Sequence, residues 1–200
     1  MDQNNKSPNL TALPEPIRDA VESFASVLRA ELADNLLSIT IVGSSLGEDF
    51  RPGLSDINAV VVLGQRTLAA LDTIAALARP LSKKKIAAPL LMTPSYIERS
   101  LDVFGVEFLD FQLSHQTVLG DDPFAPLKFD KKDVRLQCER ELKATLIRLR
   151  QGYISSAANR RVVRDILIST VKGLMPILRA MLWLKDIERP QCTELTVNRT

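Results

Sequence analysis

Residues 36–63 read LLSITIVGSSLGEDFRPGLSDINAVVVL, two β-branched apolar runs separated by a loop rich in Gly, Ser and Pro. The two runs, 36–42 and 57–63, have the length and composition of strands. A strand that stops at Gly-Ser presents free backbone N–H groups and a hydroxyl, and glycine lets a phosphate come close to the main chain. We therefore expect a phosphate-binding turn made of Gly43, Ser44 and Ser45.

Two oxygen-bearing side chains stand where the second run begins. Asp56 and Asn58 are two residues apart, so on a strand their side chains point to the same face. Two oxygen ligands near a phosphate-binding turn suit an Mg²⁺ ion that also holds phosphates. Gly-Ser turns followed by Asp are common in loops, and the alternative is that Asp56 only caps or turns the chain after the loop that contains Gly53.

Helices and strands alternate over the first 120 residues, which predicts an α/β or α+β protein. Apolar residues at helical spacing, from Ile17 to Leu32, predict a helix over residues 17–35. The other predicted elements are helices from Thr67 to Ala78 and from Thr93 or Ser95 to Leu101, and strands over 86–92 and 106–113. The three lysines at 83–85 are interpreted as a solvated turn, with a grip on an anionic ligand as the alternative.

The chain becomes purely helical after Asp130. Apolar residues three or four apart predict one long helix around 134–153 and a second over 161–185, which together form an antiparallel hairpin. Pro176 should kink or interrupt the second helix. The predicted organisation is a flexible leader over 1–13, one domain over 14–130, a helical domain over 131–187 and a structureless tail over 188–200.

The string of residues 43–59 resembles a known family signature. Gly43-Ser44, then eleven residues, then Asp56-Ile57-Asn58-Ala59 is similar to the motif of the nucleotidyltransferase fold shared with DNA polymerase beta. The longer string GSSLGEDFRPGLSDI is similar to bacterial members, including aminoglycoside nucleotidyltransferases and the minimal nucleotidyltransferases of toxin–antitoxin pairs. The resemblance covers residues 15–185, and it implies an α+β fold with a mixed sheet flanked by helices and a C-terminal helical hairpin.

The same resemblance implies roles for individual residues. Gly43 and Ser44 would bind the phosphates of a nucleotide, and Asp56 would bind the metal. Asn58 stands where the family has a second acidic ligand, and its neutral amide should weaken metal binding and catalysis.

A third carboxylate is expected on a later strand, and Glu107 and Asp110 are the candidates. Because they are three residues apart, an ideal strand cannot point both inward. Glu107 is preferred, since it resembles the position of the base in the aminoglycoside enzymes.

The activity implied by the resemblance is transfer of a nucleoside monophosphate, AMP by preference, from a nucleoside triphosphate to a hydroxyl group. The acceptor would be a small molecule or a protein, and pyrophosphate would be released with the help of Mg²⁺. Asn58 supports the alternative, a catalytically reduced module that binds nucleotide or a partner without turnover. A third interpretation is a helical interaction protein that merely keeps the fold, with a homodimer formed through the apolar C-terminal helices near Trp183.

Composition excludes several other classes of protein. Hydrophobic residues make up 46% and charged residues 25%, as in a soluble globular protein. The formal net charge of +2 conceals a split, because residues 1–130 carry net −6 and residues 131–200 carry net +8. The polar N-terminus predicts no secretory signal, and charges within the apolar stretch 166–184 argue against a membrane span. The two cysteines have no metal-ligand spacing, so a reducing, cytoplasmic setting is expected. Nucleic-acid binding is not expected, because aromatic residues are few and not interleaved with the basic ones.

Overall fold

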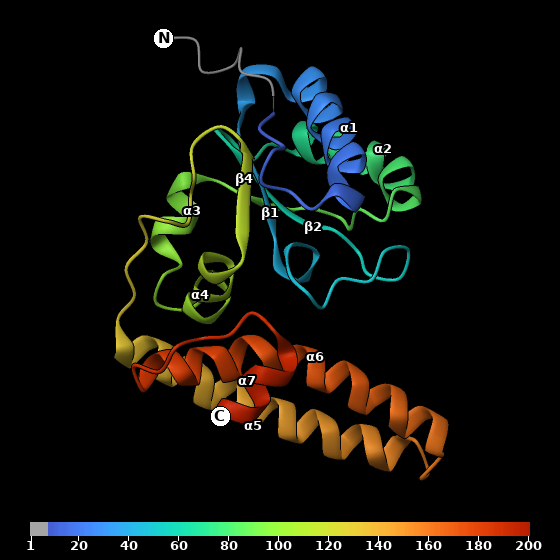
Figure 1. Cartoon of the computed structure of the whole chain (residues 1–200), viewed down its shortest axis with the longest axis vertical. Helices are drawn as coiled ribbons and strands as arrows, with labels where there is room; N and C mark the ends of the chain where they lie inside the picture. Colours follow the sequence, from blue (N-terminus) through green and yellow to red (C-terminus); the bar gives the residue numbers. More distant parts are fainter. Residues whose placement is uncertain (1–7) are drawn as a thin grey trace. The chain divides into compact units, whose positions relative to one another are not determined.

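The structure is a computed structural model that describes residues 8–200, and it divides into two compact units (Figure 1). The first unit runs up to Ser100 and includes Phe111–Leu127. The second unit consists of Leu101–Asp110 and Lys128–Thr200. Residues 101–110 therefore group with the C-terminal helices, whereas the sequence placed them in the first domain.

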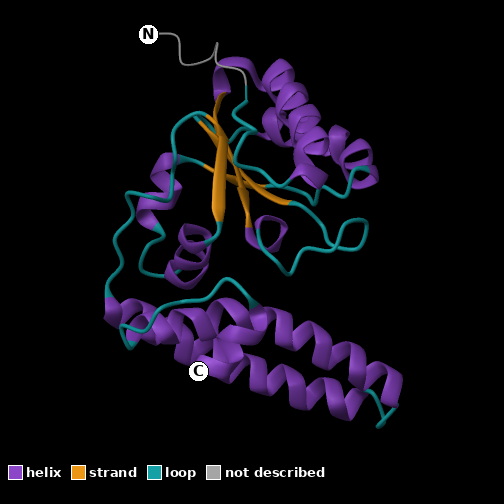
Figure 2. Cartoon of the chain, viewed as in Figure 1, coloured by secondary structure: helices purple, strands orange, loops and turns teal. Residues whose placement is uncertain are grey.

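The first unit is built on a four-stranded mixed sheet, drawn in orange in Figure 2. Its order is β3-β2-β1-β4, with β1 at Leu36–Val42, β2 at Asn58–Leu63, β3 at Leu90–Met92 and β4 at His115–Leu119. β1 is antiparallel to both of its neighbours, whereas β2 and β3 are parallel. The two strands predicted from residues 36–63 are confirmed, as is the α+β class.

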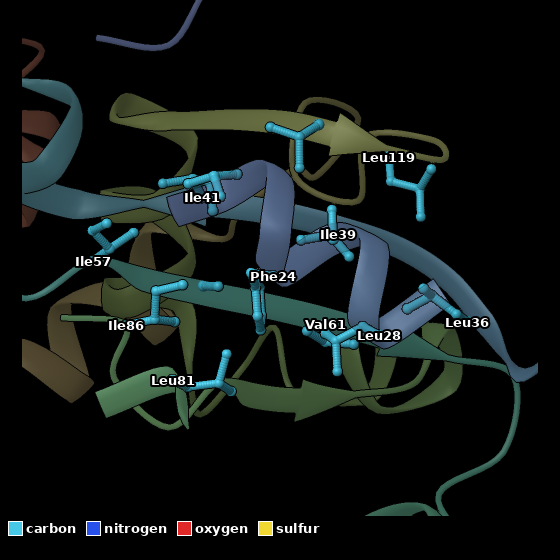
Figure 3. Packing of buried hydrophobic residues seen from close by; sticks show 14 of the residues in the cluster. Phe24, Leu28, Leu36, Ile39, Ile41, Ile57, Val61, Leu81, Ile86 and Leu119 are labelled. Carbon is cyan, nitrogen blue, oxygen red and sulfur yellow. The ribbon is translucent and has the colours of Figure 1, made fainter. Parts of the chain in front are cut away.

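Helix α1, Glu15–Leu32, packs its apolar stripe against one face of this sheet (Figure 3). Phe24 and Leu28 are fully buried there, against Ile39 and Ile41 of β1 and Val61 of β2. Burial of each such side chain stabilises the fold by about 1.5–3 kcal/mol. Helix α2, Leu68–Lys83, extends the same core and is capped by the Thr67 hydroxyl, which accepts from Ala70 N–H. This packing fixes the end of β1, where the Gly-Ser turn begins.

Two of the predicted strands are wrong in whole or in part. Residues 106–113 form helix α4, Gly105–Leu113, and the fourth strand is the short segment that follows it. The apolar pattern of VEFLDFQL satisfies both periods. The Phe104 and Phe108 rings, at the i, i+4 spacing of a helix, meet edge to face with their centroids 5.2 Å apart. In the segment 86–92 only Leu90–Met92 forms a ladder, because Pro89 has no N–H to donate.

The described part of the predicted leader is not loose. Leu13 is fully buried, and Leu10 packs on the core of the first unit. Asn9 N–H donates to Val118 O at 2.8 Å, so this segment lies along β4. Residues 1–7 of the predicted leader lie outside the described residues. Two further short elements of the first unit are η2, Ala33–Asn35, and α3, Pro94–Arg99, which Thr93 caps.

The second unit contains the predicted hairpin, with α5 at Lys131–Ser155 and α6 at Arg160–Leu184. Asn159 caps α6 by accepting from the N–H groups of Arg161 and Val162, and α6 continues through Pro176. The tail is not structureless, because Thr193–Arg199 forms α7 and Thr196 is fully buried. By length and apolar composition alone, α6 is one helix of the described chain that could cross a membrane.

Candidate functional site

The Gly-Ser turn starts where β1 ends, at Val42. Gly43 has a φ of +79°, a conformation that favours glycine, and residues Gly43–Leu46 form a single 3₁₀ turn, η3. The N–H of Gly43 donates to Ser114 O at 3.0 Å, and the Ser114 hydroxyl donates to Gly43 O at 3.2 Å. The Gly43 N–H was expected to be free for a phosphate, but the residue just before β4 already binds it.

The buried side-chain hydroxyl of Ser45 in this turn has no hydrogen-bond partner. Its side chain is fully buried, and its hydroxyl is the one buried side-chain nitrogen or oxygen in residues 8–200 without a hydrogen bond. An unsatisfied buried hydroxyl costs about 1–3 kcal/mol, so such atoms are rare in stable folds. Ser44, next to it, is exposed. A turn that keeps an unpaired buried hydroxyl beside an exposed serine fits a ligand rich in acceptor oxygens, such as a phosphate chain.

Asp56 and Asn58 lie beside this turn. Both side chains are exposed, and the intervening Ile57 is buried, so the chain alternates here as a strand does. Asn58 is paired with Val42 across the β1–β2 ladder, and a Cβ added to Gly43 would lie 3.9 Å from Asn58 Nδ2. The structure thus places Gly43 next to Asn58, and Asp56 stands two residues before Asn58 on the same face.

The chain on the other side of Ile57 contributes no carboxylate. Ile57 N–H donates to Lys85 O at 2.7 Å, and Ala87 N–H donates back to Ile57 O at 3.0 Å. The paired segment 86–92 contains no acidic residue. Across residues 8–200, no group of three or more His, Cys, Asp and Glu side chains is arranged to hold a metal ion. The Asp56 carboxylate and the Asn58 amide fit Mg²⁺ only as a partial shell, completed by phosphate oxygens and water.

Glu107 and Asp110 lie on a helix and not on the strand that the sequence predicted. They are three apart on a helix, so they share one face of α4, and both belong to the second unit. Asp110 pairs with Arg179 at 2.9 Å, with both side chains less than 15% exposed. Glu107 accepts a hydrogen bond from Gln137 Nε2 at 2.6 Å, and burial raises the pKa of Glu107 more than that hydrogen bond lowers it.

Glu107 also lines a groove within the second unit. The groove has a volume of about 640 Å³ and lies between α5 and α6. Its polar lining includes three carboxylates and one guanidinium, from Glu107, Glu141, Asp165 and Arg148. Arg148 lies 3.9 Å from Glu141, so the charge of that carboxylate is partly balanced within the groove.

We expect Glu107→Gln to stabilise the second unit at pH 7.5. A carboxyl whose pKa is raised on folding lowers the free energy of unfolding progressively as the pH rises through the folded pKa. Glutamine can accept the same hydrogen bond from Gln137 without a buried charge. The advantage of the variant should therefore vanish below the ordinary carboxyl pKa, near pH 4. Urea unfolding at both pH values measures the difference in stability between variant and wild type. A variant less stable than wild type at pH 7.5 would contradict a raised pKa of Glu107.

Sequence reasoning missed the residues that hold these groups in place. Ser114 fixes the Gly43 backbone, and Gln137 and Arg179 bind the two carboxylates, each from a distant part of the chain. No local pattern could have found them, because their roles depend on which segments pack together.

In the structure, His115 Nε2 and Asp122 Oδ2 lie 2.8 Å apart. Burial disfavours the Asp122 carboxylate, but hydrogen bonds from His115 and from the N–H groups of Phe124 and Ala125 outweigh it and lower the pKa of Asp122.

Known proteins resemble this chain only distantly. No family model matches the chain, and no curated protein matches it by sequence. The chain is similar to a crystal structure of a spectinomycin adenyltransferase from Enterococcus faecialis with ATP and spectinomycin, at 13% identity and a TM-score of 0.48. The match covers 90% of this chain and 96% of that chain. What the chain binds is therefore argued from its own residues.

Proposed function

We propose that the chain is a nucleotidyltransferase-like protein that binds a nucleoside triphosphate at the Gly43–Ser45 turn and transfers its nucleoside monophosphate, AMP by preference, to a hydroxyl group. The observation that carries the proposal is the unpartnered, fully buried Ser45 hydroxyl in a turn whose Gly43 lies next to Asn58. Phosphate oxygens would satisfy that hydroxyl. The acceptor would be a small molecule or a protein.

In this proposal Ser44 and Ser45 donate hydrogen bonds to the phosphate chain, and Asp56 with Asn58 would hold Mg²⁺ next to it. The ion, when bound, neutralises phosphate charge. The acceptor oxygen attacks the α-phosphorus, the bond from that phosphorus to the pyrophosphate oxygen breaks, and pyrophosphate leaves with the electron pair. Glu107 is the better of the two candidate proton acceptors on its chemistry, because Asp110 is neutralised by Arg179 whereas burial raises the pKa of Glu107.

One observation favours the alternative of a module that binds nucleotide without turnover. The neutral Asn58 and the acid-free segment 86–92 leave Asp56 as the one carboxylate among the residues 56–58 and 86–92 that flank this edge of the sheet. Phosphate transfer depends on metal ions that neutralise developing charge, so a weakened metal site would affect turnover more than nucleotide binding.

Asp56 is the residue whose replacement separates these possibilities. We expect Asp56→Ala to weaken Mg²⁺-dependent ATP binding about tenfold or more, equivalent to about 1.4 kcal/mol, in isothermal calorimetry. Transfer from α-labelled ATP is measured in parallel. Glu48→Ala, an exposed carboxylate of the same loop, is the matched control and should leave both unchanged. Wild-type affinity in Asp56→Ala would remove this residue from the site. Transfer by Asn58→Asp but not by wild type would establish the reduced module.

Ser45→Ala tests the turn itself. Removal of an unsatisfied buried hydroxyl should increase the free energy of unfolding by about 1 kcal/mol in the absence of ligand. The same change should weaken binding of ATP and of inorganic triphosphate, because one donor to the phosphates is lost. Chemical unfolding and calorimetry give the two values on one sample. A variant that is less stable and binds ATP as wild type does would show that the hydroxyl serves the fold rather than a ligand.

A further inference from the structure

The outer half of the helical hairpin, residues 143–172, has no buried face. Ser156 is the one buried residue in this segment, and all the buried residues of α5 and α6 lie in the other half of the hairpin. Figure 1 shows α7 beside α5 and α6 within this unit, with the 150–165 end of the hairpin extending past it. The large apolar side chains that stand exposed on this half are Leu146, Ile147, Tyr153, Ile154, Val162, Leu167, Ile168 and Val171.

A groove runs between the two helices on this half. It has a volume of about 550 Å³, and its walls are apolar side chains from both helices, with Tyr153 and Ile154 at one end. Ile154 is 76% exposed and Tyr153 57% exposed. Exposed apolar groupings of this kind mark interaction sites in soluble proteins. A continuous apolar groove between neighbouring helices suits the ridge of a third helix, as in helix-in-groove recognition.

The segment that contains this groove is strongly basic. Residues 143–172 contain seven Lys or Arg and a single acidic residue, Asp165. That aspartate is paired with Arg164 at 3.0 Å. Arg150, which lines the groove, forms no ion pair with any residue in the described range 8–200, nor do Arg160 and Arg161. An occupant of the groove would therefore bring the Arg150 guanidinium next to its own side chains, within a segment rich in further arginines.

We propose that the outer half of the hairpin, residues 143–172, docks an amphipathic helix of a partner protein, with aliphatic side chains in the groove and acidic side chains facing Arg150 and the other basic residues of this segment. Charge complementarity selects this occupant. A second copy packed hairpin to hairpin would place basic residues against basic residues, since residues 131–200 carry net +8. A lipid surface is flat and would touch the ridges of the helices, leaving the groove unfilled. The proposal does not depend on nucleotide binding.

The test uses the full chain and two labelled peptides of about 20 residues, long enough to form a helix on binding. The first peptide has Leu at every i, i+3, i+4 and i+7 position and Glu on the remaining face. The second has Lys in place of each Glu. We expect the Glu peptide to bind in fluorescence anisotropy and the Lys peptide to bind at least about tenfold more weakly.

Two variants and their matched controls locate the binding surface. Ile154→Asp and Arg150→Glu should each weaken the Glu peptide about tenfold or more. Leu68→Asp, at a residue 74% exposed in the first unit, and Arg79→Glu should leave it unchanged. Because Ile154 and Arg150 are exposed, circular dichroism should show wild-type helicity in both variants.

Several results would overturn the proposal. Equal binding of the two peptides, or no binding of either at millimolar concentration, would rule out an acidic helix as the partner. A concentration-dependent dimer in light scattering that Ile154→Asp abolishes assigns the surface to a second copy. Binding to phosphatidylserine vesicles that Ile154→Asp abolishes, without peptide binding, assigns it to a membrane.

Discussion

Gly120→Ala is expected to destabilise the first unit by about 3 kcal/mol or more, the largest effect of any single substitution considered. Gly120 follows β4 directly and has a φ of +74°. A Cβ at this position would overlap the carbonyl oxygen of Leu37 and lie 2.9 Å from the Cα of Ser38. Both obstacles are backbone of β1, which cannot move aside as a flexible side chain would.

The damage should reach the candidate site through the β1–β4 ladder. β1 is bulged between Leu36 and Ser38, where Gly120 approaches it, and its far end is tied to the start of β4 by Ser114 and Gly43. If β4 separates from β1, the hydrogen bonds that fix Gly43 are lost. We therefore expect weaker ATP binding together with the loss of stability.

Gly53→Ala is the matched control for this prediction. Gly53 has nearly the same φ, +78°, but an added Cβ would meet no atom within 4 Å. That substitution should cost about 1 kcal/mol, the price of the left-handed conformation alone. Urea unfolding followed by circular dichroism compares the two variants. Equal destabilisation by both would show that the contact with β1 does not matter.

Local sequence pattern was sufficient for much of the fold. The two β-branched runs that flank the loop 43–56 form strands, because their apolar residues do not also follow a helical spacing. Thr67, Thr93 and Asn159 cap their helices by accepting hydrogen bonds from N–H groups two or three positions away. The Gly-Ser turn could be located for the same reason. Each of these features depends on neighbours in the chain.

The features that the sequence did not predict depend instead on residues far apart in the chain. Residues 106–113 have an apolar pattern that fits both a helix and a strand, and packing with Val134 and Ile177 in the second unit decides for the helix. The Gly43 N–H is unavailable because Ser114 lies next to it, 71 positions along the chain. The ion pair of Asp110 with Arg179 was not foreseen, because nothing near Asp110 in sequence reveals Arg179. Long-range partners determine which polar groups remain free, and a single sequence does not show them.

Asp110→Ala is expected to destabilise the second unit by about 3 kcal/mol, because it leaves the buried guanidinium of Arg179 without its counter-charge. Besides Asp110, Arg179 donates to the carbonyl oxygens of Pro190 and Gln191, and Arg189 donates to Leu109 O. These bonds hold the segment between α6 and α7 against α4. The fluorescence of Trp183, the one tryptophan of the chain, reports unfolding of this unit.

An exposed ion pair in the same unit provides the control. Asp186 pairs with Lys131 at 2.6 Å, but its side chain is 79% exposed, so Asp186→Ala should change stability by no more than about 1 kcal/mol. In the double variant Asp110→Ala with Arg179→Met, the buried guanidinium that lost its counter-charge is removed as well, and part of the lost stability should return. ATP affinity should stay at the wild-type value in Asp110→Ala if this carboxylate supports the fold. Loss of nucleotide transfer with unchanged stability would instead give Asp110 the catalytic role that the sequence suggested.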